Sequence, residues 1–127
     1  MLVDVVKMVK VKTYKDLIVW QKAMDMTVML YPIVSKLPKE ETYALCSQMR
    51  RAAVSVPSNI AEGFGRNSKK EYLQFLCIAY GSVCELETQL MLCVRIEYLT
   101  EIEIQPIIEL LTEIGKIITT ITKKLNP

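Results

Sequence analysis

Adjacent cations, hydroxyl groups and a proline are concentrated in one short stretch, residues 48–66. It reads QMRRAAVSVPSNIAEGFGR, and helical spacing gives it one apolar face and one polar stripe. The apolar face holds Met49, Ala53, Val56 and Ile60, and the polar stripe holds Arg51, Ser55, Ser58 and Glu62. Cations on such a stripe could contact an anionic partner, whereas the small apolar residues allow close helix packing.

Pro57 lies inside this predicted helix. It has no N–H and its ring blocks the carbonyl of Ala53, so we expect a bend there. The freed backbone is expected to bond to nearby side chains, namely those of Ser55, Ser58 and Asn59. Gly63 and Gly65 are expected to end the helix.

Three more cations, Arg66, Lys69 and Lys70, surround the predicted start of the next helix. Free backbone N–H groups and the helix dipole favour anions at such a start, so a phosphate could bind there. The same residues also fit a capped terminus with two solvated lysines, and the sequence leaves both interpretations open.

Arg50 and Arg51 are expected on different sides of their helix. One of them could pair with Glu87, which the apolar pattern places near the core, where an unpaired carboxylate would be costly. Arg51 points away from the apolar face and is therefore available to a partner or a subunit interface.

Residue sets for catalysis or metal binding are sparse. The 127 residues include no histidine, so the commonest general base and metal ligand are both missing. The four cysteines, Cys46, Cys77, Cys84 and Cys93, form no C-x-x-C pair and fit small core residues in a reducing compartment. We therefore expect no enzymatic activity, no metal and no cofactor.

Charge is distributed unevenly along the chain. The net charge is +2, yet residues 1–70 carry 12 Lys/Arg against 6 Asp/Glu, and residues 71–127 carry 4 against 8. This asymmetry fits a surface for an anionic partner, or oppositely charged halves that attract each other within the fold or between subunits. No signal peptide or long uncharged run is apparent in the first half, so we expect a cytoplasmic protein with no membrane partner.

The elements that must position these residues are helices. We expect residues 1–13 to form a loosely ordered arm and residues 14–127 one domain, with helices over about 14–36, 39–64, 68–97 and 106–125. Ser68 and Glu71 fit a capping box, and Pro106 fits a first helical turn. Short connections predict an all-α, antiparallel up-down-up-down four-helix bundle.

Apolar spacing predicts which helix faces are buried. In the first helix the predicted buried stripe is Leu17, Trp20, Met24, Thr27, Tyr31 and Val34. In the third helix it is Leu73, Cys77, Tyr80, Cys84, Met91, Val94 and Tyr98. In the fourth helix it is Ile107, Leu111, Ile114, Ile118, Ile121 and Leu125. The first helix is apolar on nearly every side, which indicates additional burial against a neighbouring subunit.

Several segments together resemble a known family. They are YKDLIVWQKA (14–23), QMRRAAVSVPSNIAEG (48–63), GR (65–66) and AYGSVCELETQL (79–90). They resemble the four-helix-bundle proteins encoded in intervening sequences of bacterial 23S ribosomal RNA genes, a family that includes the accessory variability protein of diversity-generating retroelements.

The resemblance implies a homopentameric barrel. For the retroelement member it also implies a basic surface that binds nucleic acid and a reverse transcriptase partner. The matched motif positions are Arg50, Arg51, Ser55, Asn59, Glu62, Gly63 and Arg66.

The leading hypothesis is a non-enzymatic oligomer that binds structured RNA or DNA, as an accessory to an enzyme such as a reverse transcriptase. The alternative is an oligomeric scaffold that binds only proteins. The predicted nucleic-acid contacts are Arg51, Arg66, Lys69 and Lys70. The predicted structural or interface residues are Arg50, Ser55, Pro57, Ser58, Asn59, Glu62, Gly63 and Glu87.

Overall fold

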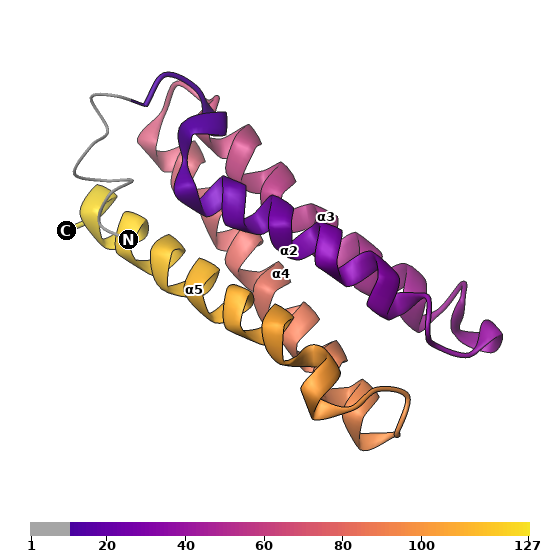
Figure 1. The fold of residues 1–127 in the computed structure, drawn as a ribbon. Coiled ribbons are helices and arrows are strands. Elements are labelled where there is room, and N and C mark those ends of the chain that lie inside the picture. The colour runs from indigo at the N-terminus through magenta and orange to yellow at the C-terminus, as the bar shows by residue number, and fades with distance from the viewer. Residues whose placement is uncertain (1–10) are drawn as a thin grey trace.

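The computed structural model describes residues 11–127, and four long helices lie lengthwise beside one another in it (Figure 1). They are α2 (Ile18–Val34), α3 (Leu45–Phe64), α4 (Lys69–Arg95) and α5 (Glu101–Leu125). Short 3-10 turns, η2 (Tyr14–Asp16) and η3 (Lys39–Glu41), precede α2 and α3, and no strand occurs in the described residues. Successive helices run in opposite directions, which confirms the predicted four-helix bundle.

The packing partners define the order of the helices around the bundle. Helix α3 packs against α2 and α4, and α5 packs against the same two helices. Helices α2 and α4 are therefore diagonal to each other. Residues 1–10 of the predicted arm lie outside the described residues, and Val11, just after them, packs against the core.

Three helix starts differ from the expectation. The first two predicted helices each begin with a 3-10 turn, so α2 and α3 begin at Ile18 and Leu45. Helix α5 begins at Glu101, because Thr100 and Glu103 form a capping box in which each side chain accepts the other's backbone N–H. Pro106 consequently lies inside α5 and not in its first turn.

Helix α4 begins as predicted after Ser68, whose hydroxyl accepts the backbone N–H of Glu71 at 3.0 Å. The carboxylate of Glu71 lies 3.7 Å from the Arg66 guanidinium. The Ser68 half of the predicted capping box is thus present, whereas the Glu71 carboxylate lies near the Arg66 guanidinium.

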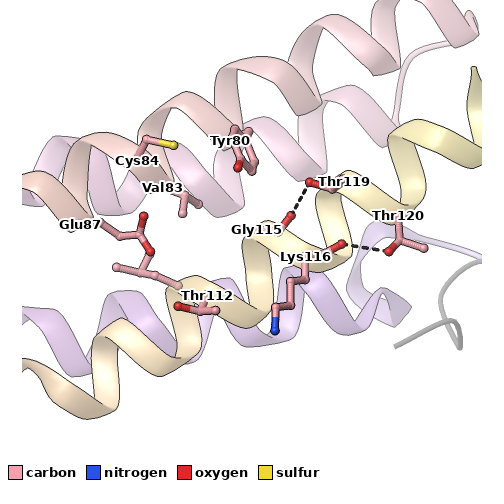
Figure 2. A pocket seen from close by; sticks show the side chains of 10 residues that line it. Tyr80, Val83, Cys84, Glu87, Thr112, Gly115, Lys116, Thr119 and Thr120 are labelled. Atoms are coloured by element: carbon pink, nitrogen blue, oxygen red, sulfur yellow. Dashed lines mark hydrogen bonds between the residues drawn. The ribbon is translucent and has the colours of Figure 1, made fainter.

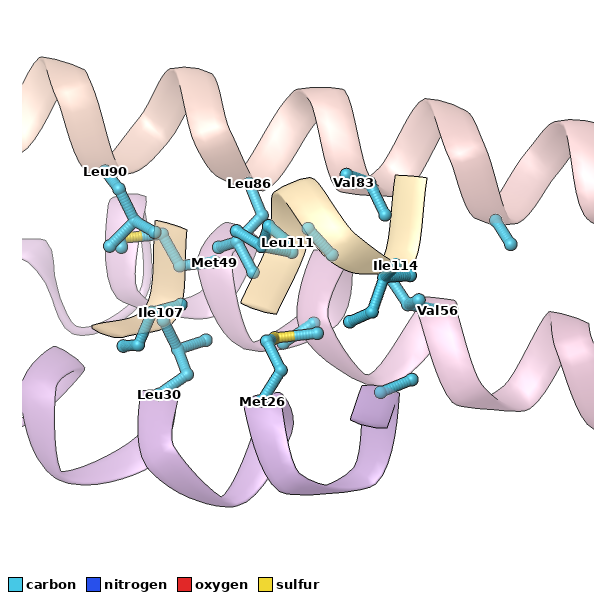
Figure 3. Close-up of a cluster of buried hydrophobic side chains, with 14 of the residues drawn as sticks. Met26, Leu30, Met49, Val56, Val83, Leu86, Leu90, Ile107, Leu111 and Ile114 are labelled. Atoms are coloured by element: carbon cyan, nitrogen blue, oxygen red, sulfur yellow. The ribbon is translucent and has the colours of Figure 1, made fainter. Parts of the chain in front are cut away.

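The predicted core faces of α3 and α5 are confirmed. Met49, Ala53, Val56 and Ile60 are fully buried, and the α5 residues from Ile107 to Ile121 that were expected in the core are buried too. Figure 3 shows Met49 and Val56 of α3 and Ile107, Leu111 and Ile114 of α5 together with Leu86 and Leu90 of α4 and Met26 and Leu30 of α2.

The predicted faces of α2 and α4 are largely wrong. Helix α2 buries Val19, Ala23, Met26, Leu30 and Val34, and α4 buries Leu76, Ala79, Val83, Leu86, Leu90 and Cys93. Met24, Tyr31, Tyr80 and Met91 of the predicted stripes are instead 40%, 43%, 43% and 52% exposed. Both helices carry two apolar stripes, and spacing alone does not tell which one faces the core.

Pro57 leaves α3 continuous and creates a link to α2. Because residue 57 has no N–H, the carbonyl of Ala53 lacks its normal partner within the helix. The Thr27 hydroxyl of α2 lies 3.2 Å from that carbonyl and 2.8 Å from the Ala23 carbonyl of its own helix, so its one proton is shared between the two acceptors. We expected Ser55, Ser58 and Asn59 to satisfy the freed backbone. Asn59 does donate to a nearby backbone carbonyl, that of Ser55, at 2.8 Å, but the side-chain donor to the Ala53 carbonyl comes from the neighbouring helix.

Small and hydroxyl residues bring α3 and α4 together. A Cβ atom added to the buried Gly63 would lie 2.6 Å from Phe75 Cβ, so only glycine fits there. The Ser82 hydroxyl of α4 donates to the Ser55 hydroxyl at 2.8 Å, and the Asn59 side-chain amide donates to the same oxygen at 2.9 Å. These contacts fix the register of the two helices.

The link between Pro57 and Thr27 predicts coupled mutations. Thr27→Val should lower the free energy of unfolding by about 1–3 kcal/mol, because it leaves the Ala53 carbonyl without a donor. In a Pro57→Ala background the new N–H supplies that donor, so Thr27→Val should cost clearly less. Urea denaturation of the four proteins tests this, and equal costs in the two backgrounds would contradict it.

Two glycines of similar helical context predict opposite effects. Gly63→Ala should lower the free energy of unfolding by about 1–3 kcal/mol, because its Cβ meets Phe75 and Tyr72. Gly81→Ala is the matched control, since no atom lies within 4 Å of its added Cβ. This substitution should stabilise α4 by about 0.5–1 kcal/mol. Urea midpoints that shift in the same direction would refute the close-approach role of Gly63.

Candidate nucleic-acid interface

The antiparallel topology brings three basic segments to one end of the bundle. They are the residues that lead into α2, the connection between α3 and α4, and the end of α5 (Figure 1). We call this the basic end. Its cations are Lys12, Lys15, Arg66, Lys69, Lys70, Lys123 and Lys124, and its carboxylates are Asp16, Glu62 and Glu71. Seven cations against three carboxylates give a net charge of +4.

The opposite end has the opposite sign. Its carboxylates are Glu40, Glu41, Glu97, Glu101 and Glu103, and its cations are Lys36, Lys39 and Arg95. Five carboxylates against three cations give −2. A chain with a net charge of only +2 therefore presents a clearly basic surface at one end.

Arg66 is held in place by three neighbours. Its guanidinium lies 3.2 Å from Glu62 and 3.7 Å from Glu71, and it stacks over the Phe75 ring at 5.0 Å. These two carboxylates offset part of its positive charge, so less of that charge is available to an anionic partner than we expected from the sequence.

Lys69 and Lys70 are the most accessible of the predicted cations. They are the first two residues of α4, both are exposed, and neither forms an ion pair with any residue in the described range 11–127. The first N–H groups of a helix have no acceptor within it, which adds a favourable field for an anion. These two lysines are the centre of the candidate interface.

Four lysines at this end were not predicted as contacts from the sequence. Lys123 and Lys124 are exposed in the last turn of α5, Lys15 is exposed within η2, and Lys12 is exposed just before it. Their spacing carries no motif. The topology brings them together, because an up-down-up-down bundle places the chain start, the second connection and the chain end at the same end of the bundle.

Asp16 remains a negative charge at the basic end. Backbone N–H groups of Lys12 and Thr13 donate to its carboxylate at 2.9 and 3.1 Å. These hydrogen bonds, with that of Lys12 the larger cause, lower the pKa of Asp16. The carboxylate thus stays ionised at neutral pH.

Arg51 lies apart from the other predicted nucleic-acid residues. It lines a polar hollow of about 380 Å³ between α3 and α4, together with Gln48, Ser55, Ser82 and Glu85. Thirteen helical steps, about 20 Å along the axis, separate it from Phe64 at the end of α3, and Arg66 follows two residues later. The structure therefore groups Arg66, Lys69 and Lys70 and leaves Arg51 on a side of the bundle.

Glu87 forms no pair with either arginine. The Arg50 guanidinium lies over the Tyr31 ring at 5.6 Å, on the side where α2 meets α3. Glu87 lies on the opposite side, between α4 and α5, where burial raises the pKa of its carboxyl. The predicted pair within one chain is wrong, because the stripe that contains Glu87 is not the one that faces the core.

An apolar groove runs between α4 and α5. Figure 2 shows Tyr80, Cys84 and Glu87 of α4 opposite Gly115 and Thr119 of α5, around a hollow of about 450 Å³. A second hollow of about 300 Å³ shares Tyr80 and Thr119 with the first and continues the groove toward the basic end.

Helix α4 accordingly has apolar residues on two sides. Among the described residues it is the single helix long and apolar enough to cross a bilayer by length and composition. Core helices of soluble proteins share that property, and one side of α4 packs against α3 and α5. Within the same residues, no group of three or more histidine, cysteine or acidic side chains could hold a metal ion.

Comparisons with known proteins agree with this architecture. Residues 15–120 match the family model described as the 23S rRNA-intervening sequence protein. A crystal structure of a protein of unknown function from the S23 ribosomal protein family of Bacteroides thetaiotaomicron is similar, with a TM-score of 0.77 and 28% identity. The match covers 84% of this chain and 99% of that one. A comparison with curated proteins finds no match.

Proposed function

Because the chain belongs to the 23S rRNA-intervening sequence protein family, we propose that it is a non-enzymatic bundle that assembles with copies of itself and binds structured RNA or DNA. The basic end is the observation that carries this proposal. It gathers seven cations from three segments, with Lys69 and Lys70 exposed at its centre.

Assembly makes the modest charge of each chain effective. In a ring whose bundles lie parallel, every basic end is on the same side, so several clusters of cations form one face. Each additional cluster that reaches the same nucleic acid then binds at a high effective concentration. We propose five copies per ring, in the cytoplasm, and a role as accessory to an enzyme such as a reverse transcriptase.

Contacts of this kind recognise the backbone. Lysine ammonium groups and helix N-termini bind phosphate oxygens, which fix the position of a nucleic acid but carry no sequence information. The proposal therefore expects little preference among sequences and a strong dependence on salt, because each phosphate contact releases counterions.

Removing the central lysines should weaken binding. Lys69→Gln/Lys70→Gln should lower the affinity for duplex DNA and for a structured RNA. It should also flatten the log–log salt dependence by about 0.9 for each duplex phosphate that is no longer neutralised. Fluorescence anisotropy across a salt series measures both. Light scattering should show an unchanged mass, several times the 14.5 kDa of one chain, because neither lysine packs in the core.

The matched control removes two cations from the acidic end. Lys39→Gln/Arg95→Gln changes the net charge by the same amount at exposed positions. It should leave the salt slope unchanged. Equal effects of the two double variants would show that net charge alone attracts the nucleic acid. No binding by the unmutated oligomer at low salt would instead favour the scaffold that binds only proteins.

A further inference from the structure

Two opposite sides of the bundle carry apolar residues that no other part of the described chain covers. On the side where α2 meets α3, the exposed residues are Met24, Val28, Tyr31 and Val54, with Val28 70% exposed. We call this the α2/α3 face. The groove between α4 and α5 lies on the other side, since α2 is diagonal to α4 and α3 is diagonal to α5.

Each of these surfaces contains a charged side chain that forms no ion pair with any described residue. Arg50 on the α2/α3 face stacks on Tyr31 but forms no ion pair with any described residue. Glu87 in the groove likewise forms none, and its carboxyl is partly removed from water. Lys116 of α5 also lines this groove and forms no ion pair with any described residue. The complementarity is therefore between two individual groups, the Arg50 guanidinium on one surface and the Glu87 carboxylate in the other.

Arg50 and Glu87 also lie at the same height along the bundle. The hydrogen bond between Ser55 and Ser82 sets the register of α3 against α4. Arg50 lies five residues before Ser55, and Glu87 lies five residues after Ser82. Because the two helices are antiparallel, both steps run in the same direction and cover the same distance, about 7.5 Å.

Equal height is the condition that a closed ring imposes. When two different surfaces of one chain meet, the contact repeats from copy to copy and closes only if there is no net rise along the rotation axis. With bundles parallel to that axis, a residue of one face can meet only groove residues at its own height. Arg50 and Glu87 satisfy this condition.

We propose that the groove between α4 and α5 holds the α2/α3 face of a second copy of this chain, with Arg50 of one copy paired with Glu87 of the next. The inference rests on the self-assembly in the proposed function and names the surfaces that produce it. It also explains why α2 and α4 each carry a second apolar stripe.

Charge reversal tests the pair. Arg50→Glu and Glu87→Arg should each place like charges in a poorly hydrated contact and raise the dissociation constant of the oligomer by about tenfold or more. The double variant Arg50→Glu/Glu87→Arg restores opposite charges in every contact and should reassemble. Analytical ultracentrifugation measures the mass, and circular dichroism confirms that each variant folds.

The outcomes separate the pair from the oligomer. An unmutated protein that is monomeric would overturn both the interface and the assembly part of the proposed function. An oligomer that survives both single reversals, or a double variant that fails to reassemble, would overturn the pair while leaving nucleic-acid binding intact.

A cysteine bridge tests the same interface without changing charge. The register places Val54 within one residue of the height of Cys84, which lines the groove. Val54→Cys should therefore give disulfide-linked multimers on mild oxidation, visible as a ladder on a non-reducing gel. Arg51→Cys, on the side where α3 meets α4, is the control and should give none. A ladder for both variants, or for neither, would overturn the proposed docking.

Discussion

The close contact between α3 and α4 is the constraint on which the rest of the molecule depends. Gly63 lets the two helices approach, and the hydroxyls of Ser55 and Ser82 fix how far one is shifted along the other. That shift determines where the connection with Lys69 and Lys70 lies relative to the two chain ends. It also sets Arg50 and Glu87 at one height on opposite sides, although neither residue takes part in the contact.

The motif around Pro57 is explained mainly by packing between helices. A proline inside a helix removes a donor, and here the Ala53 carbonyl shares the Thr27 hydroxyl of α2 with the Ala23 carbonyl. The donor lost at Pro57 is thus replaced by a hydrogen bond between α2 and α3, which is more directional than apolar contact alone. Asn59 strengthens the contact on the other side of α3 by donating to Ser55. Ser55 thus joins α3 to α4, whereas Asn59 donates within α3 and Glu62 pairs with Arg66. Arg50 and Arg51 form no ion pair with any described residue.

The sequence predicted the elements better than their orientations. Helices α3 and α5 each have one apolar stripe, so Ile60 and Ile114 could be placed in the core from spacing alone. Helices α2 and α4 have two stripes each, and a choice between them requires the positions of their neighbours. Glu87 was misplaced for this reason. The capping box of Thr100 and Glu103 starts α5 before Pro106, whereas Pro106 was expected in its first turn.

The field at the basic end arises mainly from side chains, and the helix ends add little to it. In an antiparallel bundle each end combines two helix N-termini with two C-termini, and their partial charges largely cancel. The start of α4 alone would therefore attract a phosphate only weakly, because α3 and α5 end beside it. Lys123 and Lys124 offset the negative C-terminus of α5, and Lys69 and Lys70 then add to a surface that is already positive. The arrangement of the helices, more than the total charge, thus determines where an anionic partner would bind.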